Sequence, residues 1–219
     1  MLGRTAETKT FHAQVIDIKH LIARYNPREV VIDTNGLGVG IGDEMIREQY
    51  DEEGNLLPAY GFINDDNYKK VQPKDAICIC YSFKANGPLK SQVHGNCYSR
   101  LNSGMVRFLI NEQQAKSDLL ATKVGQKMTV EQRVKRLMPH EMTTKLFDEM
   151  ANLRLKRVGA GLDIVLEPIN TRYPDDKYMA FAYGLWRIKE LEDAQRKRRK
   201  RFGNSSTGAS RYLFFTGGN

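Results

Sequence analysis

Residues 29–45 read EVVIDTNGLGVGIGDEM, a short apolar run followed by a glycine-rich turn and the start of a helix. The run Glu29–Asp33 is β-branched and ends in an acid, which is typical of a central strand in a sheet covered on both faces. Before it, residues 11–25 (FHAQVIDIKHLIARY) have apolar side chains at helical spacing, and Asn26-Pro27 ends that pattern. The order helix, strand, turn and helix predicts a layered α/β domain.

Further strand and helix patterns follow along the chain. We predict strands at Ala59–Ile63, Asp75–Phe83, Met105–Ile110 and Leu162–Leu166, and helices at Val93–Leu101 and Thr129–Leu153. Pro139 is expected to interrupt the second of these helices, and residues 112–127 are polar and ambiguous. Pro174-Asp175-Asp176 begins a long helix, because proline and aspartate suit a first helical turn. The face of that helix carries Met179, Tyr183, Trp186 and Ile188.

The composition is that of a globular protein. The chain has 219 residues, a net charge of +8, 41% hydrophobic residues and 27% charged residues. The length predicts one sizeable domain, and the two fractions are typical of a folded chain. Three cysteines form no disulfide framework, and their odd number favours a reducing compartment. No apolar run is long enough for a membrane span, and the N-terminus lacks a secretory signal pattern. We therefore expect an intracellular protein with no membrane partner.

The positive charge is concentrated near one end of the chain. The segment from Arg187 to Arg201 contains eight Lys and Arg residues and three acidic residues. It therefore carries +5 of the total charge of +8. The densest part consists of Arg196, Lys197, Arg198, Arg199, Lys200 and Arg201, which we call the basic block. Such a block binds polyanions or is a solvated helix end. We favour nucleic acid over a membrane, because no apolar face accompanies the charge.

Asp33 is the first candidate for chemistry. An ionisable group at the end of an apolar strand is costly to bury unless it is paired or binds a metal. The carboxyl ends of strands are also where open α/β sheets bind ligands. The alternative is that Asp33 only bonds to the backbone of the turn that follows it, and the residue alone does not decide between the two readings.

The glycines at positions 36, 38, 40 and 42 raise the question of a nucleotide-binding loop. Their spacing is not that of a dinucleotide fingerprint, and no phosphate-binding P-loop motif occurs in the chain. A tight turn with close packing of the helix on the sheet is therefore the favoured interpretation.

Asp175 and Asp176 open the long helix, where paired carboxylates are usually caps. Together with Asp33 they gain a second interpretation, because carboxylates from distant positions could meet over one face of a sheet. Hard cations such as Mg²⁺ take oxygen ligands of this kind, and two such ions would activate a water in phosphodiester cleavage. Asp65-Asp66 lies in a polar loop and is expected to be a solvated turn, although it could assist.

Three stretches together resemble a known family. VVIDTNGLGVGIGDEM (30–45), SQVHGNCYSRLNSGMVRFLI (91–110) and DDKYMAFAYGLW (175–186) occur in the order found in the C-terminal nuclease domain of the tailed-bacteriophage terminase large subunit. KVGQKMTVEQR (123–133) and the terminal basic helix fit the same family. The resemblance runs from about Phe11 to Arg201.

The resemblance implies an RNase H-like (Holliday-junction-resolvase-like) fold, with a mixed central sheet flanked by helices. It implies three acidic positions that bind Mg²⁺ or Mn²⁺ at a two-metal site and cut concatemeric double-stranded DNA. Asp33 matches the acid at the strand end and Asp176 the acid at the helix start, with Asp175 as its neighbour. It also implies as partners the terminase ATPase part, the small terminase subunit and the portal, in the cytoplasm of a bacterial host carrying a phage or prophage.

The chain departs from the family at its beginning. The family's first acid lies in a three-strand meander before the helix at residues 11–25, and only ten residues precede that helix here. We therefore expect residues 1–201 to be a partial terminase nuclease domain without its N-terminal strands, and residues 202–219 to be a flexible tail. The alternatives are a catalytically incomplete DNA-binding fragment that needs the missing part in trans and, less favoured, a nucleotide-binding α/β protein.

Overall fold

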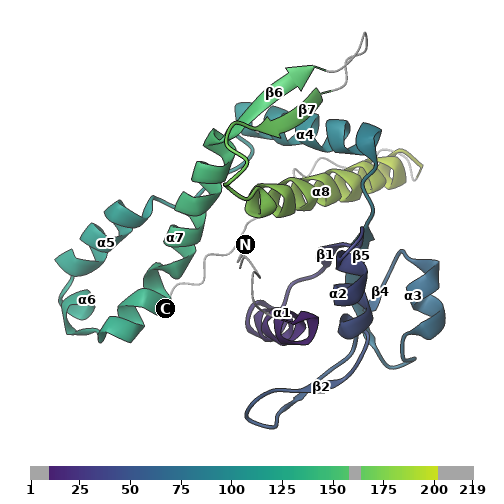
Figure 1. Cartoon of the computed structure of the whole chain (residues 1–219), viewed down its shortest axis with the longest axis horizontal. Helices are drawn as coiled ribbons and strands as arrows, with labels where there is room; N and C mark the ends of the chain where they lie inside the picture. The colour runs from purple at the N-terminus through teal and green to yellow at the C-terminus, as the bar shows by residue number, and fades with distance from the viewer. Residues whose placement is uncertain (1–9, 158–163, 202–219) are drawn as a thin grey trace. The chain divides into compact units, whose positions relative to one another are not determined.

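The computed structural model describes residues 10–157 and 164–201 (Figure 1). The chain divides into two units, residues 1–187 and residues 188–219. The tail that we expected at residues 202–219 lies outside the described part, as does the beginning of the strand predicted at Leu162–Leu166. Within the described ranges, no helix has the length and apolar character required to cross a membrane.

The first unit contains a small parallel sheet flanked by helices, so the α/β prediction is confirmed. Its strands are β1 (Val30–Asp33), β5 (Ile77–Phe83) and β4 (Tyr60–Phe62), in the order β1-β5-β4. We predicted a mixed sheet, whereas these three strands are all parallel. The reason lies in the connections, because α3 (Asp66–Val71) returns the chain from β4 to the same edge before β5 begins.

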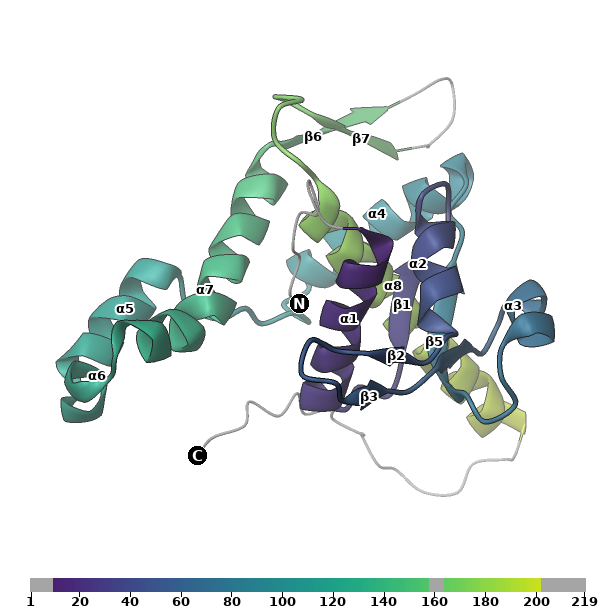
Figure 2. The ribbon, with the colours of Figure 1, turned by 60° about the horizontal axis from the view of Figure 1, so that its bottom comes forward.

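The two faces of the sheet pack against different helices. Ile32 and Cys80 face a core that includes Val15 and Ile22 of α1 (Phe11–Tyr25) and Met45 at the end of α2 (Gly38–Met45). Figure 2 shows α1 and α2 beside β1. The short strands β2 (Gln49–Tyr50) and β3 (Leu56–Leu57) form an antiparallel hairpin after α2.

The opposite face of the sheet packs against the first part of α8 (Asp176–Arg201), up to Arg187, which belongs to the first unit. The ring of Phe83 lies 4.3 Å from the ring of Tyr183, centroid to centroid. The guanidinium carbon of Arg187 lies 3.9 Å from the centroid of the Tyr81 ring, and the same side chain donates to Glu29 at 2.8 Å. Because side chains alternate along a strand, Asp33, the register partner of Phe83, belongs to this face.

The helices between β5 and α8 begin at clear side-chain caps. They are α4 (Gly87–Asn102), α5 (Glu112–Ala121), α6 (Lys123–Lys127) and α7 (Val130–Ala151). The ambiguous residues 112–127 are helical because Asn111 and Thr122 cap α5 and α6. Pro139 lies inside α7 and does not end it.

Two strand predictions in this region need correction. Residues 105–110 form no strand, because the aromatic side chain of Phe108 packs against Phe147 and Phe181 rather than into a sheet. The strand β6 (Leu153–Arg157) was not predicted, and it pairs antiparallel with β7 (Ile164–Pro168).

Candidate active site at the carboxyl edge of the sheet

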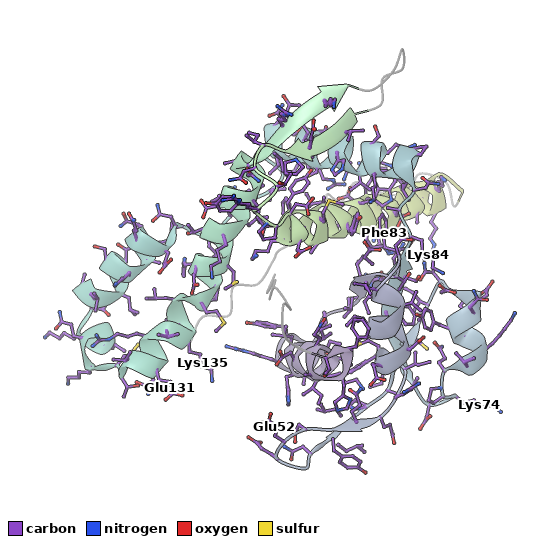
Figure 3. All side chains as sticks on the ribbon, in the orientation of Figure 1. Glu52, Lys74, Phe83, Lys84, Glu131 and Lys135 are labelled. Carbon is purple, nitrogen blue, oxygen red and sulfur yellow. The ribbon has the colours of Figure 1, made fainter. Side chains whose placement is uncertain are left out.

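The carboxyl ends of β1, β4 and β5 meet at one edge of the sheet, because the three strands are parallel. Helices α2, α3 and α4 begin directly after these strands, so their N-termini lie at the same edge. Figure 3 labels Phe83 and Lys84 at the end of β5. Ligands of open α/β sheets bind at this edge.

The turn after β1 holds Asp33 by its backbone and by its side chain. The backbone N–H of Asn35 donates to Asp33 Oδ1 at 3.0 Å, and the Asn35 amide donates to the carbonyl of Ala85 at 3.3 Å. Gly36 has a φ of 54°, which favours glycine. At Gly38 a Cβ atom would lie 1.7 Å from the carbonyl oxygen of Asp33. These contacts support the packing interpretation of the glycine series.

Tyr183 of α8 interacts with two of the predicted acids. Its hydroxyl is hydrogen-bonded to Asp33, and it is also within electrostatic range of Asp175. Burial raises the pKa of Tyr183 to about 12, and the negative charges of Asp33 and Asp175 contribute to that shift. The phenol is therefore a neutral hydrogen-bond donor at neutral pH. The end of β1 therefore lies beside α8 at Tyr183. That the carboxylates of Asp33 and Asp176 meet in one metal site stays a prediction.

The start of α8 is capped by a residue that the sequence did not reveal. Glu149 of α7 is 4% exposed and accepts from the backbone N–H groups of Lys177 at 2.8 Å and Tyr178 at 3.0 Å. The ammonium group of Lys177 donates to the same carboxylate at 2.7 Å. Glu149 therefore satisfies N–H groups that we had expected Asp175 and Asp176 to serve.

Asp176 lies in a crowded acidic environment. The residue is exposed at its surface, yet the loss of water around its carboxyl group raises its pKa. The negative charges of Asp175 and Glu149 raise that pKa further, whereas Lys177 opposes them. Repulsion of this kind is expected where carboxylates are gathered without a compensating cation.

His94 of α4 adjoins this acidic group. Its Nδ1 lies 3.0 Å from the hydroxyl of Tyr178, and the residue is 8% exposed. Burial lowers the pKa of His94, Lys90 lowers it further, and Asp175 acts in the opposite direction. Neither His94 nor Tyr178 could have been found from spacing, because the partners are 84 positions apart in the sequence.

The carboxylates fit a divalent cation by their chemistry, since Mg²⁺ and Mn²⁺ prefer oxygen ligands. Among the described residues, however, no group of three or more His, Cys, Asp or Glu side chains is arranged to hold a metal ion. Asp33, Asp175 and Asp176 therefore do not form a complete metal site by themselves.

Asp65 and Asp66 have different environments, although they are adjacent. Asp66 is solvated, with its carboxylate 2.9 Å from the ammonium of Lys69. Asp65 is only 8% exposed and caps α3 by accepting from the backbone N–H of Asn67. The expectation of a solvated turn is therefore wrong for Asp65, which accepts a hydrogen bond from Ser82 near the carboxyl end of β5.

The basic block is exposed over Arg196–Arg199, and the side chains of Lys200 and Arg201 lie outside the description. Within the second unit, Asp193 lies 2.7 Å from the ammonium of Lys189 and 3.9 Å from Arg196. Hydrogen bonding from Lys189 lowers the pKa of Asp193. One acid thus offsets a small part of the positive charge on this helix.

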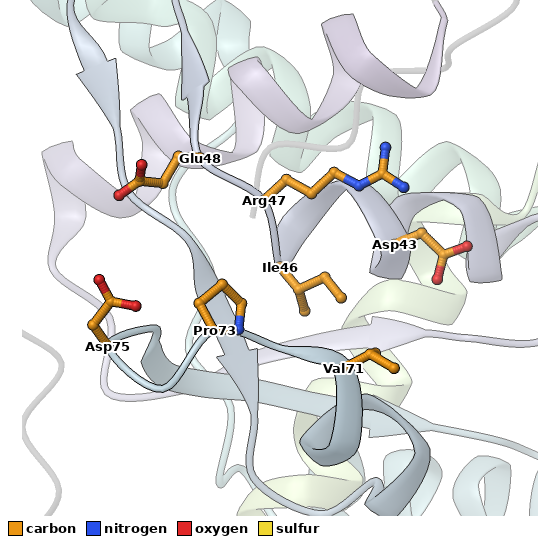
Figure 4. Close-up of a pocket in the computed structure, with 7 residues that line it drawn as sticks. All are labelled: Asp43, Ile46, Arg47, Glu48, Val71, Pro73 and Asp75. Atoms are coloured by element: carbon orange, nitrogen blue, oxygen red, sulfur yellow. The ribbon is translucent and has the colours of Figure 1, made fainter.

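A pocket of about 600 Å³ lies elsewhere, at the amino end of β5 (Figure 4). It is lined by Asp43, Ile46, Arg47, Glu48, Val71, Pro73 and Asp75. Residues 43–48 lie at the end of α2 and Asp75 lies before β5, so the pocket is at the edge opposite to Asp33. It does not belong to the candidate site.

No protein-family model matches this sequence, and comparisons with curated proteins and with solved structures likewise find no match.

Proposed function

We propose that this chain is the DNA-cleaving part of a tailed-bacteriophage terminase large subunit. In this proposal the fold is of the RNase H-like kind, and the substrate is concatemeric double-stranded DNA. The partners are the terminase ATPase part, the small subunit and the portal, in the cytoplasm of the bacterial host. The observation that supports it best is the position of Tyr183, which is bonded to Asp33 and within electrostatic range of Asp175.

In this proposal, the residues around the site orient the carboxylates that would hold the metal ions. The hydroxyl of Tyr183 and the backbone N–H of Asn35 orient the carboxylate of Asp33. Glu149 fixes the first turn of α8 and so the position of Asp176. Bound Mg²⁺ or Mn²⁺ would activate the water and stabilise the leaving oxygen. Orientation by fixed groups matters because small displacements at a reacting centre cost large factors in rate.

A second candidate function is a DNA-binding component that is catalytically incomplete alone. The observation in its favour is that the described residues gather no group of three potential metal ligands. In two-metal cleavage the missing carboxylate would impair both metal affinity and the position of the water. The two candidates therefore differ in whether this chain alone cleaves DNA.

Metal binding tests the site itself. We expect Asp33→Asn and Asp176→Asn each to weaken Mn²⁺ binding, measured by electron paramagnetic resonance titration of the purified chain. Asp66→Asn is the matched control, because Asp66 is an exposed acid paired with Lys69. Equal Mn²⁺ affinity in all four proteins would exclude the proposed metal site.

Plasmid cleavage with Mn²⁺ then separates the two candidates. We expect weak or no cutting by the chain alone, and cutting when a polypeptide carrying the terminase ATPase part and the first acidic strand is added. Asp33→Ala or Asp176→Ala should abolish the restored activity. Strong cutting by the chain alone that is lost in Asp33→Ala would support the nuclease and reject the incomplete component.

A further inference from the structure

A buried polar network joins the ends of all three sheet strands. Asp65, directly after β4, accepts from Ser82 Oγ at 3.0 Å and from Lys84 Nζ at 2.7 Å. The hydroxyl of Ser82 in β5 lies 2.6 Å from that of Thr34, which directly follows Asp33 in the chain. Thr34, Ser82 and Asp65 are 2%, 6% and 8% exposed. The network therefore fixes Lys84 relative to the end of β1.

The charge state of Asp65 explains why Lys84 stays in this position. Burial acts to raise the pKa of Asp65, but hydrogen bonds from Lys84, Ser82 and the backbone of Asn67 outweigh it, and the pKa is lowered. Asp65 is thus a charged carboxylate at neutral pH. Because a buried charge is costly without a partner, the ammonium of Lys84 is held beside it.

Lys84 lies at the same edge of the sheet as Asp33, but its ammonium is bonded to Asp65 and not to the candidate acids. It follows Phe83, the register partner of Asp33. Side chains alternate along β5, so Ser82 and the network lie on the face opposite to Asp33 and Tyr183. The side chain of Lys84 is 52% exposed, and its ammonium has three N–H donors, of which the bond to Asp65 uses one. The other two donors remain for a ligand, on a side chain that is half exposed at the carboxyl edge of the sheet.

We propose that Lys84 contacts a backbone phosphate of the DNA strand that enters the candidate site. This assignment rests on the proposed function, since it requires that DNA binds at the carboxyl edge. A lysine that is free in solution loses side-chain entropy when it binds a ligand. Lys84 has already been placed by Asp65, so less of that entropy remains to be lost. The ligand class is a phosphodiester, recognised by charge and not by base sequence.

The opposing interpretation is that Lys84 only neutralises Asp65. A salt-dependence measurement separates the two, because each phosphate contact contributes a slope of about −0.9 to log K against log salt. A residue with a purely structural role leaves that slope unchanged.

The experiment measures binding of a fluorescent DNA duplex by anisotropy over a range of NaCl concentrations, in EDTA so that no metal contributes. Lys84→Gln removes the charge and keeps a hydrogen-bond donor for Asp65. We expect the slope to become less steep by about 0.9. Lys74→Gln is the matched control, because Lys74 is an exposed lysine before the opposite end of β5 (Figure 3), and it should keep the wild-type slope.

A second pair of variants covers the case in which Lys84→Gln does not fold. Asp65→Asn with Lys84→Gln leaves no unpaired buried charge, and it is compared with Asp65→Asn alone. The same loss of about 0.9 in slope is expected between them. An unchanged slope with DNA binding intact would overturn the assignment of Lys84 alone. Failure of the wild-type chain to bind DNA would overturn the proposed function as well.

Discussion

Glu149 stabilises the start of α8, although it belongs to a different helix. Its carboxylate is almost fully buried and binds two backbone N–H groups and the ammonium of Lys177. Removing one partner of a buried charge pair leaves the other uncompensated. Asp176 occupies the first turn of the same helix, so the stability of this cap also sets the geometry of the candidate site.

We expect Glu149→Ala to lower the free energy of unfolding by about 3 kcal/mol in urea denaturation. Glu141→Ala in the same helix is the control, because Glu141 forms an exposed pair with Lys145. That variant should lose less than about 1 kcal/mol. Similar losses in the two variants would mean that the cap of α8 does not depend on Glu149.

Asp65 gives the fold a pH dependence of known sign. Its pKa is lowered below the ordinary value of 3.8, so its contribution to stability is present above that value. The contribution is lost as the pH falls through the lowered pKa, because the folded state must then accept a proton. We expect Asp65→Asn to be less stable than wild type by about 2 kcal/mol at neutral pH. The difference should shrink on acidification below about pH 4, measured by urea denaturation at each pH.

The positions of single residues were predictable only where the signal is local. Asp33 was expected at a strand end and Asp176 at a helix start, and the structure has both there. Their role in a metal site stays a prediction. Tyr183 was assigned only to a helix face, and Glu149 was not identified at all. The partners of Glu149 lie 28 and 29 positions further along the chain, so no spacing rule connects them.

At the scale of helices and strands, prediction succeeded where local signals agree. The helix at Phe11–Tyr25 was predicted to the residue, because Thr10 caps its start and Asn26 ends it in the left-handed conformation before Pro27. Prediction failed where tertiary contacts decide. The apolar run at residues 105–110 resembles a strand, but Phe108 packs against α7 and α8, while Leu109 and Ile110 are exposed.

The basic block of α8 carries a prediction at this scale. It has no interleaved aromatic residues, so it is expected to contact phosphates and not to stack on bases. Replacing Arg196–Arg201 with Ser and Gly should weaken DNA binding and make its salt slope less steep, by about 0.9 for each lost phosphate contact. Anisotropy titrations over a range of NaCl concentrations measure both quantities. Unchanged affinity and slope would identify a merely solvated helix end.

At the scale of the whole molecule, the α/β class followed from the order of elements, but the sheet arrangement did not. The order β1-β5-β4 inserts the last of these strands between the other two. The spacing of apolar residues can indicate that a segment is a strand, but it does not specify which strand lies beside it. The parallel direction follows from the crossover helix α3, which the sequence did not predict.

The four glycines after β1 are alike in the sequence but have different neighbours in the structure. At Gly38 a side chain would meet the backbone of the chain itself, which cannot move aside. At Gly40 it would meet the ring of Phe11, and at Gly42 the ring of Tyr68, which are side chains that can change in size. A larger residue could therefore replace Gly40 or Gly42 in evolution once the aromatic residue beside it had been replaced by a smaller one. No such compensating substitution exists for Gly38, because its neighbour is backbone.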